Sequence, residues 1–498
     1  MNKKQWENSR GVTERIYIKG ELSLKTPTHF GNGDTSKITD IPLLRDELDP
    51  TVPLLTGTSI AGALRNYLRE FECGYGFGET GMGSIRAEQL FGYVEDASAN
   101  DEGSEGSIQS WLMVDDAFGE IPKNGPPVEI RDGVVIESKS RTAEEGKKFD
   151  IELLPAGTTF ELKLEFWLNE SNENLLESLA IALKGFEKGD IRLGMRKRRG
   201  YGQCKVIKWQ VNRYKMTEAD GIIGWLTHSD ETEGVTHSDI FELLGVSLEM
   251  QHQGESFSIE ATFQIADSLL IRSDYSDTSP ETNNGYLADT IHLKSFRNGG
   301  AQPILSGTSL AGVIRSRAYK IVNTLKGEDF ADEITNNMFG KRIFSAKDIP
   351  SGSRVIIKEA EIKNGITNLI QNRIKIDRFT GGAYPGALFS EQPLFGKSEQ
   401  KTQVTIDIKL LKTKNANKFK AEVGLLLMVL KDLWTGDLPV GGGSSVGRGR
   451  LKGVKATLKH GDKIWQIKEE NGKLVFSGDN KPEELENQYV RFLLEDVK

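Results

Sequence analysis

The chain has 498 residues and a formal net charge of −8, with 37% hydrophobic and 27% charged residues. This globular mixture excludes wholesale disorder, and the length predicts about three domains. Two cysteines, Cys73 and Cys204, cannot make a disulfide framework or an all-cysteine zinc site. The N-terminal segment has no apolar core typical of a secretory signal, and no apolar run approaches the ~20 residues of a membrane helix. We therefore expect a cytoplasmic protein that does not contact a membrane.

Strand and helix signals alternate in the first half of the chain. Apolar residues at every second position predict half-buried strands at Ile16–Leu24 and Phe160–Phe166. Between them, the GTS segment at Gly57–Ser59 precedes a helical segment, Ala61–Phe71, and its hydroxyl side chains suit a helix N-terminus. A further helix is predicted near Glu177–Phe186. This order predicts an α+β fold with helices on one face of a sheet.

The same signals return in the second half. The segment Met216–Gly254 has a polar composition typical of a linker. After it, alternation predicts strands at Phe257–Ile265 and Val404–Leu410, and a helix is predicted at Ala311–Leu325. Near the C-terminus, two alternating runs within Ile464–Phe476 flank an Asn-Gly pair, which predicts a β-hairpin.

The chain is an internal repeat with an offset of about 250 residues. The segment Leu55–Arg65 (LTGTSIAGALR) returns as Leu305–Arg315 (LSGTSLAGVIR). Three glycines that end the first half return at the end of the second half, and the matched positions are Gly194, Gly200 and Gly202 with Gly441, Gly447 and Gly449. We therefore predict a first domain at residues 1–218, a linker at 219–253 and a second domain with a C-terminal extension at 254–498.

Positive charge is concentrated near these glycines although the whole chain is acidic. Nine basic and no acidic residues lie between Ile191 and Thr217, and five basic and no acidic residues lie between Val440 and His460. A basic run is often only a solvated surface, and that interpretation stays open. Its recurrence in both halves favours two local binding sites for nucleic acid.

Each half contains one ordered set of features: a strand, a polar loop with an aspartate, a GTS helix start with an arginine, a strand pair, a helix and a basic glycine-rich end. This set resembles the RAMP superfamily of CRISPR-associated proteins, and the tandem arrangement is similar to double backbone subunits of type III-D-like complexes. Pro439–Gly449 (PVGGGSSVGRG) is similar to the family's glycine motif, Lys197–Gly202 (KRRGYG) is a looser version, and Thr28–Asp46 resembles its first loop.

The resemblance implies two tandem ferredoxin-like (RRM-like) RAMP domains with inserted thumb hairpins. It implies as partners a guide crRNA, a target RNA, other RAMP subunits and a large subunit of the effector complex. The thumb hairpins would wedge between nucleotides of a guide–target duplex, and an apolar tip can unstack bases. They are expected in Val128–Thr159 and Thr367–Gln403, with the candidate residues Arg141, Phe149, Arg378 and Phe379. A plain surface hairpin is the alternative.

The basic, glycine-rich segments and the GTS helix starts of both halves provide the candidate RNA contacts. A helix N-terminus offers free amides and a positive dipole end, which suit a phosphate, although a plain helix cap is the alternative. Arginines beside a Gly-Tyr-Gly turn could hold a phosphate and stack a base. The predicted RNA-binding residues are Gly57, Thr58, Ser59, Arg65, Arg69, Arg198, Arg199, Tyr201, Gly307, Thr308, Ser309, Arg315, Arg448 and Arg450.

Asp40 and Asp289 are the candidate catalytic residues, because each precedes its GTS helix by nearly the same distance and lies where the family carries a catalytic aspartate. Asp34, Asp46, Asp274 and Asp277 lie nearby. A lone aspartate is a weak general base, so a divalent metal, Mg²⁺ by expectation, would bind at Asp40 and Asp289. His29 and His292 could assist, but they do not align in the repeat and are interpreted as surface histidines.

These features predict a backbone subunit of a type III CRISPR complex that binds guide RNA and cleaves complementary RNA at two sites, as a metal-dependent endoribonuclease. Three alternatives stay open: a non-catalytic structural crRNA-binding subunit, a guide-processing RAMP endoribonuclease, and an interaction scaffold that does not bind RNA. The processing enzymes rely on a histidine, and none is placed equivalently in both halves. The scaffold leaves the paired basic segments unexplained.

Overall fold

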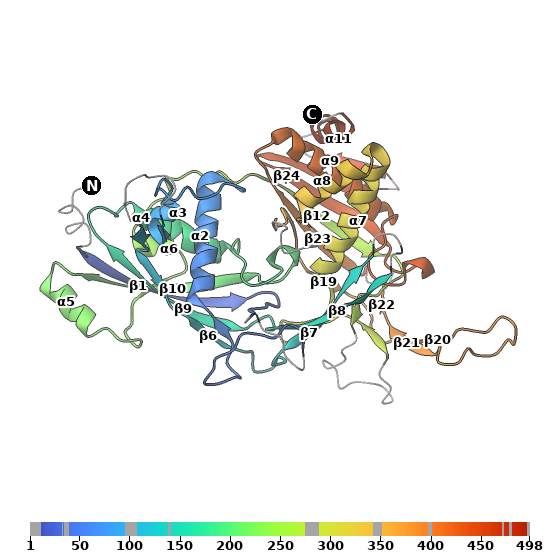
Figure 1. Ribbon diagram of the computed structural model, residues 1–498, viewed down its shortest axis with the longest axis horizontal. Coiled ribbons are helices and arrows are strands. Elements are labelled where there is room, and N and C mark those ends of the chain that lie inside the picture. Colours follow the sequence, from blue (N-terminus) through green and yellow to red (C-terminus); the bar gives the residue numbers. More distant parts are fainter. Residues whose placement is uncertain are drawn as a thin grey trace.

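The computed structural model describes residues 11–31, 33, 39–94, 107–137, 140, 142–273, 288–341, 351–396, 401–470, 473–477 and 481–495. Two units of mixed helix and sheet lie side by side along the long axis (Figure 1). We call them the first copy, residues 14–244, and the second copy, residues 256–494.

The first copy is built on an antiparallel sheet with the order β11-β10-β1-β9-β6-β2, and β5 also pairs with β9. Its chain order β1, α2, β5–β6, β9, α4, β10 places the fourth, first, third and second core strands side by side, which is the ferredoxin-like order. The bounds are β1 (Glu14–Leu24), β2 (Leu54–Leu55), α2 (Gly57–Cys73), β5 (Leu112–Val114), β6 (Ala117–Glu120), β9 (Thr159–Leu168), α4 (Leu175–Lys188), β10 (Cys204–Lys215) and β11 (Val235–His237).

The second copy repeats this topology. Its core strands lie in the order β24-β12-β23, followed by β18 and β19, and β25 and β26 extend the sheet beyond β24. The bounds are β12 (Ser256–Ile265), β16 (Lys294–Arg297), β17 (Gly300–Leu305), α7 (Gly307–Lys326), α8 (Glu328–Phe339), β18 (Val355–Ile357), β19 (Ala360–Lys363), β23 (Gln403–Leu411), α9 (Ala416–Thr435), β24 (Leu451–His460), β25 (Lys463–Glu470) and β26 (Lys473–Ser477).

Period-two burial explains why these segments are strands. Along β1 the side chains of Ile16, Ile18, Leu22 and Leu24 are buried, and polar residues alternate with the first two. The strands β9, β12 and β23 show the same alternation. The four predicted strands, the repeat and the ferredoxin-like α+β fold are therefore confirmed.

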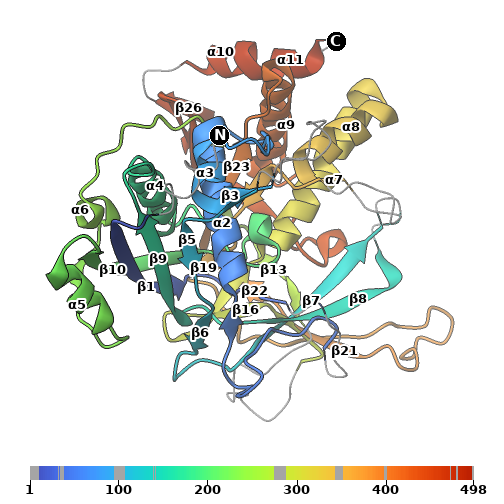
Figure 2. The ribbon, with the colours of Figure 1, turned by 60° about the vertical axis from the view of Figure 1, so that its left-hand side comes forward.

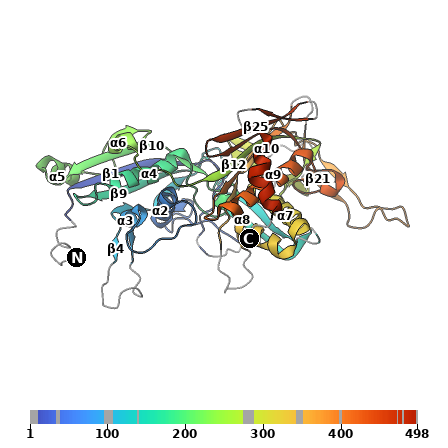
Figure 3. The same cartoon turned by 90° about the horizontal axis from the view of Figure 1, so that it is seen from above.

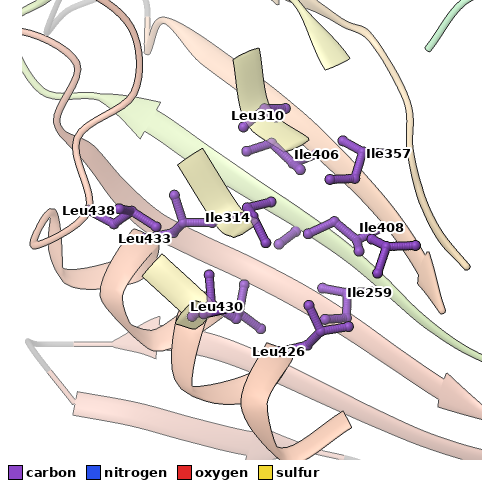
Figure 4. Packing of buried hydrophobic residues seen from close by; sticks show 14 of the residues in the cluster. Ile259, Leu310, Ile314, Ile357, Ile406, Ile408, Leu426, Leu430, Leu433 and Leu438 are labelled. Atoms are coloured by element: carbon purple, nitrogen blue, oxygen red, sulfur yellow. The ribbon is translucent and has the colours of Figure 1, made fainter. Parts of the chain in front are cut away.

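Apolar side chains of α7 and α9 form the core of the second copy together with the sheet. Leu310 of α7 lies beside Ile406 of β23, Leu426 of α9 lies beside Ile259 of β12, and Ile314 and Leu430 belong to the same cluster (Figure 4). A corresponding cluster joins α2 and α4 to β1 and β9 in the first copy. Each copy thus has its own hydrophobic core, which is the mark of a domain.

The segment expected to be a linker instead packs onto the first copy. It contains α5 (Ala219–Leu226), β11 and α6 (Ile240–Leu244). Strand β11 pairs with β10, and Ile240 and Leu244 are buried in the first core. Polar composition alone predicted a linker because the apolar residues that anchor this segment are few.

The C-terminal extension covers the second copy. Strands β25 and β26 form the predicted antiparallel hairpin, whose Asn471-Gly472 turn lies outside the described residues. Beyond it, Leu485, Tyr489 and Leu493 join the second core. These residues lie in the terminal helices α10 (Pro482–Leu485), η3 (Glu486–Val490) and α11 (Arg491–Leu494).

Each copy carries a long hairpin inserted before the third core strand. The first is formed by β7 (Glu129–Ile136) and β8 (Ala143–Leu153), and the second by β20 (Gln371–Arg373) and β21 (Phe389–Gln392). Figure 2 shows both hairpins on the lower right, below α7 and α9, and Figure 3 shows the second hairpin at the opposite end of the molecule from α5. The predicted inserted hairpins are therefore present.

Short elements complete the chain between these parts. They are α3 (Arg86–Phe91), β3 (Gly92–Tyr93), β4 (Ile108–Gln109), η1 (Lys197–Arg199), β13 (Ser268–Leu269), β14 (Arg272–Ser273), β15 (Thr290–His292), β22 (Leu394–Phe395) and η2 (Ser444–Val446).

The glycine-rich loop of the first copy docks on the second copy at the start of α7. A Cβ at Gly307 would lie 2.3 Å from the carbonyl oxygen of Arg199, and a Cβ at Gly200 would lie 2.7 Å from the backbone nitrogen of Glu359. Both glycines therefore allow two backbones to approach more closely than any side chain permits.

Gly200→Ala is expected to destabilise the protein more than Gly447→Ala, its equivalent in the second copy. Both glycines have positive φ, +100° and +89°, so both substitutions carry backbone strain of about 1 kcal/mol. Gly447 has no atom within 4 Å of its Cβ position, whereas Gly200 meets the second copy. Overpacking should lower the free energy of unfolding by about 1–3 kcal/mol more in Gly200→Ala. Equal losses in denaturant titrations would contradict this contact.

Candidate nucleic-acid interface

Asp40 and Asp289 occupy matching positions at the base of the two hairpins. The Asp40 carboxylate accepts the backbone N–H of Asp150 at 2.9 Å, and the Asp289 carboxylate accepts that of Ser390 at 2.7 Å. In each copy, the residue after the aspartate forms a parallel bridge with the residue after that donor. Both aspartates are exposed. The repeat predicted from sequence spacing is thus also a repeat in space.

The two aspartates differ in their neighbours. Across the first hairpin Asp150 faces Asp132, and the hydrogen bond between them, with partial burial, raises the pKa of Asp150. The corresponding pair in the second hairpin is Ser390 and Asn372. The backbone N–H and the hydroxyl of Ser390 both donate to Asp289 and lower the pKa of its carboxyl. At these matching positions the first site therefore has two carboxylates, and the second has a hydroxyl and an amide.

The glycine-rich loops are tied to the aspartate-bearing loops in the same way in both copies. The Gly202 N–H donates to the Pro27 carbonyl at 3.2 Å, and the Gly449 N–H donates to the Ser268 carbonyl at 2.7 Å. Both glycines have positive φ, and a Cβ would lie 1.8 Å or 2.0 Å from a carbonyl oxygen across the loop. Glycine is thus required where the basic loop meets the candidate site.

The start of α2 is occupied by protein groups. Thr56 caps the helix by accepting the Ser59 N–H, and the Gly57 N–H donates to the Asp116 carboxylate at 2.6 Å. Gly57 is buried, while Thr58 and Ser59 are exposed. The expected approach of a phosphate to Gly57 is therefore replaced by a protein contact, as the helix-cap alternative predicted.

The start of α7 is likewise covered. Ser306 caps this helix by accepting the Thr308 N–H, and Gly307 packs against the first copy as described above. Thr308 and Ser309 remain partly exposed. Gly307 serves the contact between the copies and leaves no room for a phosphate at its own position.

Three helix arginines predicted to bind RNA contact protein groups instead. Arg65 donates to Glu79 at 2.8 Å, and Arg69 lies 3.6 Å from the same carboxylate. Arg315 donates to the Gly340 carbonyl at 2.9 Å. These bonds hold the segments after α2 and α8 in place, so the three residues have a structural role that the sequence pattern did not reveal.

The basic loop of the first copy concentrates positive charge next to the junction. Arg199 is exposed, and Arg198 lies 3.8 Å from Glu70. Burial, and then repulsion from Arg198, lowers the pKa of Arg192 to about 10. Cations that destabilise one another are stabilised by a bound anion, so the loop favours a phosphate.

Two other predicted RNA contacts are buried. Tyr201 is 2% exposed, and the Arg131 guanidinium lies 5.8 Å from its ring centre. Arg448 is 3% exposed and donates to Glu391 at 2.7 Å. The prediction that Tyr201 stacks a base and that Arg448 holds a phosphate is therefore corrected, because neither side chain reaches the surface. Arg450 is exposed.

The hairpins present their predicted aromatic residues differently. Phe149 is partly buried beneath the Arg196 guanidinium, 4.7 Å from its ring centre. Phe379 is 95% exposed at the end of the second hairpin, where the Asp377 carboxylate accepts its N–H at 2.7 Å and fixes the turn. The neighbouring Arg378 is also exposed. The second hairpin thus presents a fixed, exposed aromatic tip.

The two histidines are buried, not at the surface as predicted. The His29 ring is 2% exposed with Nδ1 2.7 Å from the Glu152 carbonyl. His292 is 1% exposed, its Nδ1 accepts the Ile271 N–H at 3.3 Å, and burial lowers its pKa to about 4. Neither ring is accessible to an RNA strand.

No preformed metal site is found in the described part of the chain, where no three His, Cys, Asp or Glu side chains gather in a group that could hold an ion. Asp40 and Asp289 each offer one exposed carboxylate, the type of oxygen ligand that Mg²⁺ prefers. Such an ion would need further ligands from RNA. Asp34, Arg141, Asp274 and Asp277 lie outside the described residues.

A buried charge network joins the first hairpin to the second copy. Arg131 donates to Glu129 and to Glu359, each at 3.0 Å, and Arg297 pairs with Glu359. The Phe296 N–H donates to Glu129 at 2.7 Å. Burial by itself lowers the pKa of Arg131. The carboxylates of Glu359 and Glu129 raise this pKa by more than burial lowers it, so it lies above its ordinary value.

The division of the chain into two similar copies agrees with a comparison to known protein families. The model of the RAMP superfamily matches residues 21–205 and 288–452, which is most of the chain and falls in both copies. The chain belongs to the RAMP superfamily. Membership supports a CRISPR-associated, RNA-binding role within a multi-subunit complex. The chain matches no curated protein.

Among the helices that the structure describes in the two RAMP copies, none combines the length and the apolar character needed to cross a membrane.

Sequence reasoning missed the charge network between the RAMP copies. Glu129 and Arg131 alternate along a predicted hairpin, a pattern that indicates a solvated strand face. The partner Glu359 is more than two hundred residues away in a weak strand signal, and nothing local to either segment indicates their contact.

Glu359→Gln is expected to loosen the contact between the RAMP copies. It would leave Arg131 buried with one fewer carboxylate, and breaking a buried pair typically costs about 3–5 kcal/mol. Hydrogen exchange at the Phe296 amide should accelerate, because its bond to Glu129 crosses the same interface.

Glu422→Gln is the matched control, since Glu422 forms a buried pair with Arg354 within the second copy. It should destabilise that copy without selectively exposing the Phe296 amide. Unchanged exchange at Phe296 in Glu359→Gln would contradict a structural role for the network.

Proposed function

We propose that this protein is a double RAMP backbone subunit of a type III CRISPR effector, which holds guide crRNA and cleaves complementary target RNA at two sites. The observation that carries the proposal is the matched placement of Asp40 and Asp289, each bonded to the returning strand of its own hairpin. One aspartate, one hairpin and one glycine-rich loop recur in each copy. This recurrence gives two equivalent sites, which would contact one RNA strand at two positions.

The contact between the copies supports a place in a chain of RAMP subunits. It is head-to-tail, because the glycine-rich loop of the first copy meets the helix start of the second. When a head-to-tail contact repeats from subunit to subunit, it builds an open filament unless the rotation between subunits closes it into a ring. The corresponding surfaces that the other copy does not cover are the exposed residues Thr58 and Ser59 at the start of α2 and the loop at Gly447. Other RAMP subunits, and the large subunit of the complex, would contact these ends.

RNA binding would rest on local charge, since the net charge of the chain is −8. The exposed cations of the basic loops, among them Arg199 and Arg450, lie in segments whose glycines are bonded to the aspartate-bearing loops. Phosphate contacts by such residues release counterions and make affinity dependent on salt. The exposed Phe379 would insert between nucleotides and open the backbone for cleavage, as apolar wedges do in duplexes.

The chemistry proposed at each site is attack of a ribose 2′-OH on the adjacent phosphate, with release of the following 5′-oxygen. The chain's contribution would be to splay the nucleotide with the hairpin and to place a carboxylate beside the 2′-OH. The carboxylate would accept or orient its proton. A Mg²⁺ ion held between this carboxylate and the RNA would stabilise negative charge that develops on the phosphate.

A structural crRNA-binding subunit without cleavage is the second candidate. It is favoured by the second site, where Ser390 lowers the pKa of Asp289 and makes it a weak base. The guide-processing alternative loses support because His29 and His292 are buried. The scaffold alternative leaves the crowded cations at Arg192 without a purpose.

Asp40→Ala and Asp289→Ala test cleavage in the complex assembled with guide RNA. Each substitution should remove one set of target fragments, and the double variant should bind target but not cut it. Loss of a catalytic group typically lowers the rate about 100-fold or more, which is plain on a sequencing gel.

Asp46→Ala is the matched control, because Asp46 lies in the same loop as Asp40 and its carboxylate accepts the nearby Leu48 N–H. It should leave both sets of fragments unchanged. Cleavage by the double variant at every parental position and rate would instead favour the structural-subunit candidate.

A further inference from the structure

The second copy contains an arginine cluster that the sequence pattern did not single out. Glu391, on β21, is 2% exposed, and three guanidinium groups converge on its carboxylate. Arg448 donates at 2.7 Å, the Nε of Arg373 lies at 2.9 Å, and Arg272 approaches to 3.7 Å. Glu391 follows Ser390 directly, so the cluster adjoins the candidate site at Asp289.

The cluster carries excess positive charge among the residues that the structure describes. One carboxylate balances one of the three arginines, and Arg448 uses a further N–H on the neutral Gln371 oxygen at 2.7 Å. Arg448 is the buried member, whereas the side chains of Arg373 and Arg272 are 32% and 63% exposed. An arginine has five N–H donors, so both exposed members retain donors that face solvent.

The first copy has no such cluster at the matching positions. The equivalent hydrogen bonds of the two copies show which positions match. The bonds of the glycine-rich loops match Gly31 with Arg272 and Tyr201 with Arg448. The strand pairing of the hairpins matches Gly133 with Arg373. A side chain at Gly133 would collide with the Phe149 ring, since a Cβ there would lie 2.1 Å from it. Arg131, the arginine that the structure describes on the first hairpin, is balanced by carboxylates of both copies. Among the described residues, this arginine cluster is therefore specific to the second site.

We propose that Arg272 and Arg373 bind one phosphodiester group of an RNA strand beside Asp289, and that buried Glu391 orients both side chains. The inference rests on the proposed function and assigns an additional phosphate contact to the second site alone. Arginine suits this role because its planar donors match phosphate oxygens and its charge does not titrate.

An RNA phosphate fits these residues better than a neighbouring protein subunit. In the first copy the contact with the second copy is made by Arg131, Glu129 and the loop at Gly200. Gly31 and Gly133, which match the two exposed arginines, take no part in that contact among the described residues. A subunit docked in the same way on the second copy would therefore leave Arg272 and Arg373 to the RNA.

The test uses the full-length chain and a fluorescein-labelled single-stranded oligouridylate, titrated by anisotropy over a series of KCl concentrations. For Arg272→Gln combined with Arg373→Gln, the slope of log K against log[KCl] should fall by about 0.7, the value for one lost phosphate contact on a single strand. Affinity at low salt should fall roughly tenfold, as expected for loss of a charge-assisted contact.

Arg491→Gln is the control for a charge lost elsewhere, because Arg491 is 57% exposed on the terminal helix and its substitution removes one positive charge, half the change in the double variant. It should change neither the slope nor the affinity. A double variant that matches the parent in both would overturn the arginine site while leaving the proposed function intact. Unchanged RNA binding with loss of association to another RAMP subunit would also overturn it. A parent that binds no RNA at any salt would instead refute the proposed function.

Discussion

The orientation of the two copies relative to each other depends on charged side chains that are almost completely buried. Arg131 and Glu359 are 3% and 0% exposed, and each belongs to a different copy. A buried charge without its partner is strongly destabilising. Rotation of one copy against the other would separate these charges and therefore raise the free energy of the protein. Glu129 and Arg297 complete the network and balance its charge. Because Arg131 lies on the first hairpin, the same network fixes the base of that hairpin beside the second copy.

This constraint determines how the two candidate sites are arranged. Asp40 and Asp289 are each bonded to the hairpin of their own copy, and the copies are held by the network and by the contact at Gly200 and Gly307. An RNA strand that follows both sites would therefore meet them at a constant separation. The sites are equivalent in backbone but not in chemistry, since Asp150 and Asp132 of the first hairpin are replaced by Ser390 and Asn372 in the second.

The sequence predicted the parts of this structure that depend on local patterns. Alternation placed the core strands, and the repeated GTS and glycine motifs identified matched elements in the two copies. Burial was harder to predict, because a motif does not show what packs against it. Tyr201 and Arg448 lie in basic, glycine-rich segments typical of surfaces, yet both are enclosed by distant hairpin residues. Contacts such as Arg131 with Glu359 depend on tertiary packing and left no local signal.

The central claim is that one RNA strand runs across both copies past Asp40 and Asp289. Photocrosslinking of a single bound strand that carries 4-thiouridine, followed by mass spectrometry of the crosslinked peptides, tests it most directly. The account predicts crosslinks from that strand to both hairpins, at peptides that contain Phe149 and Phe379. Crosslinks confined to one copy, or to the helices α4 and α9 of both copies, would contradict it.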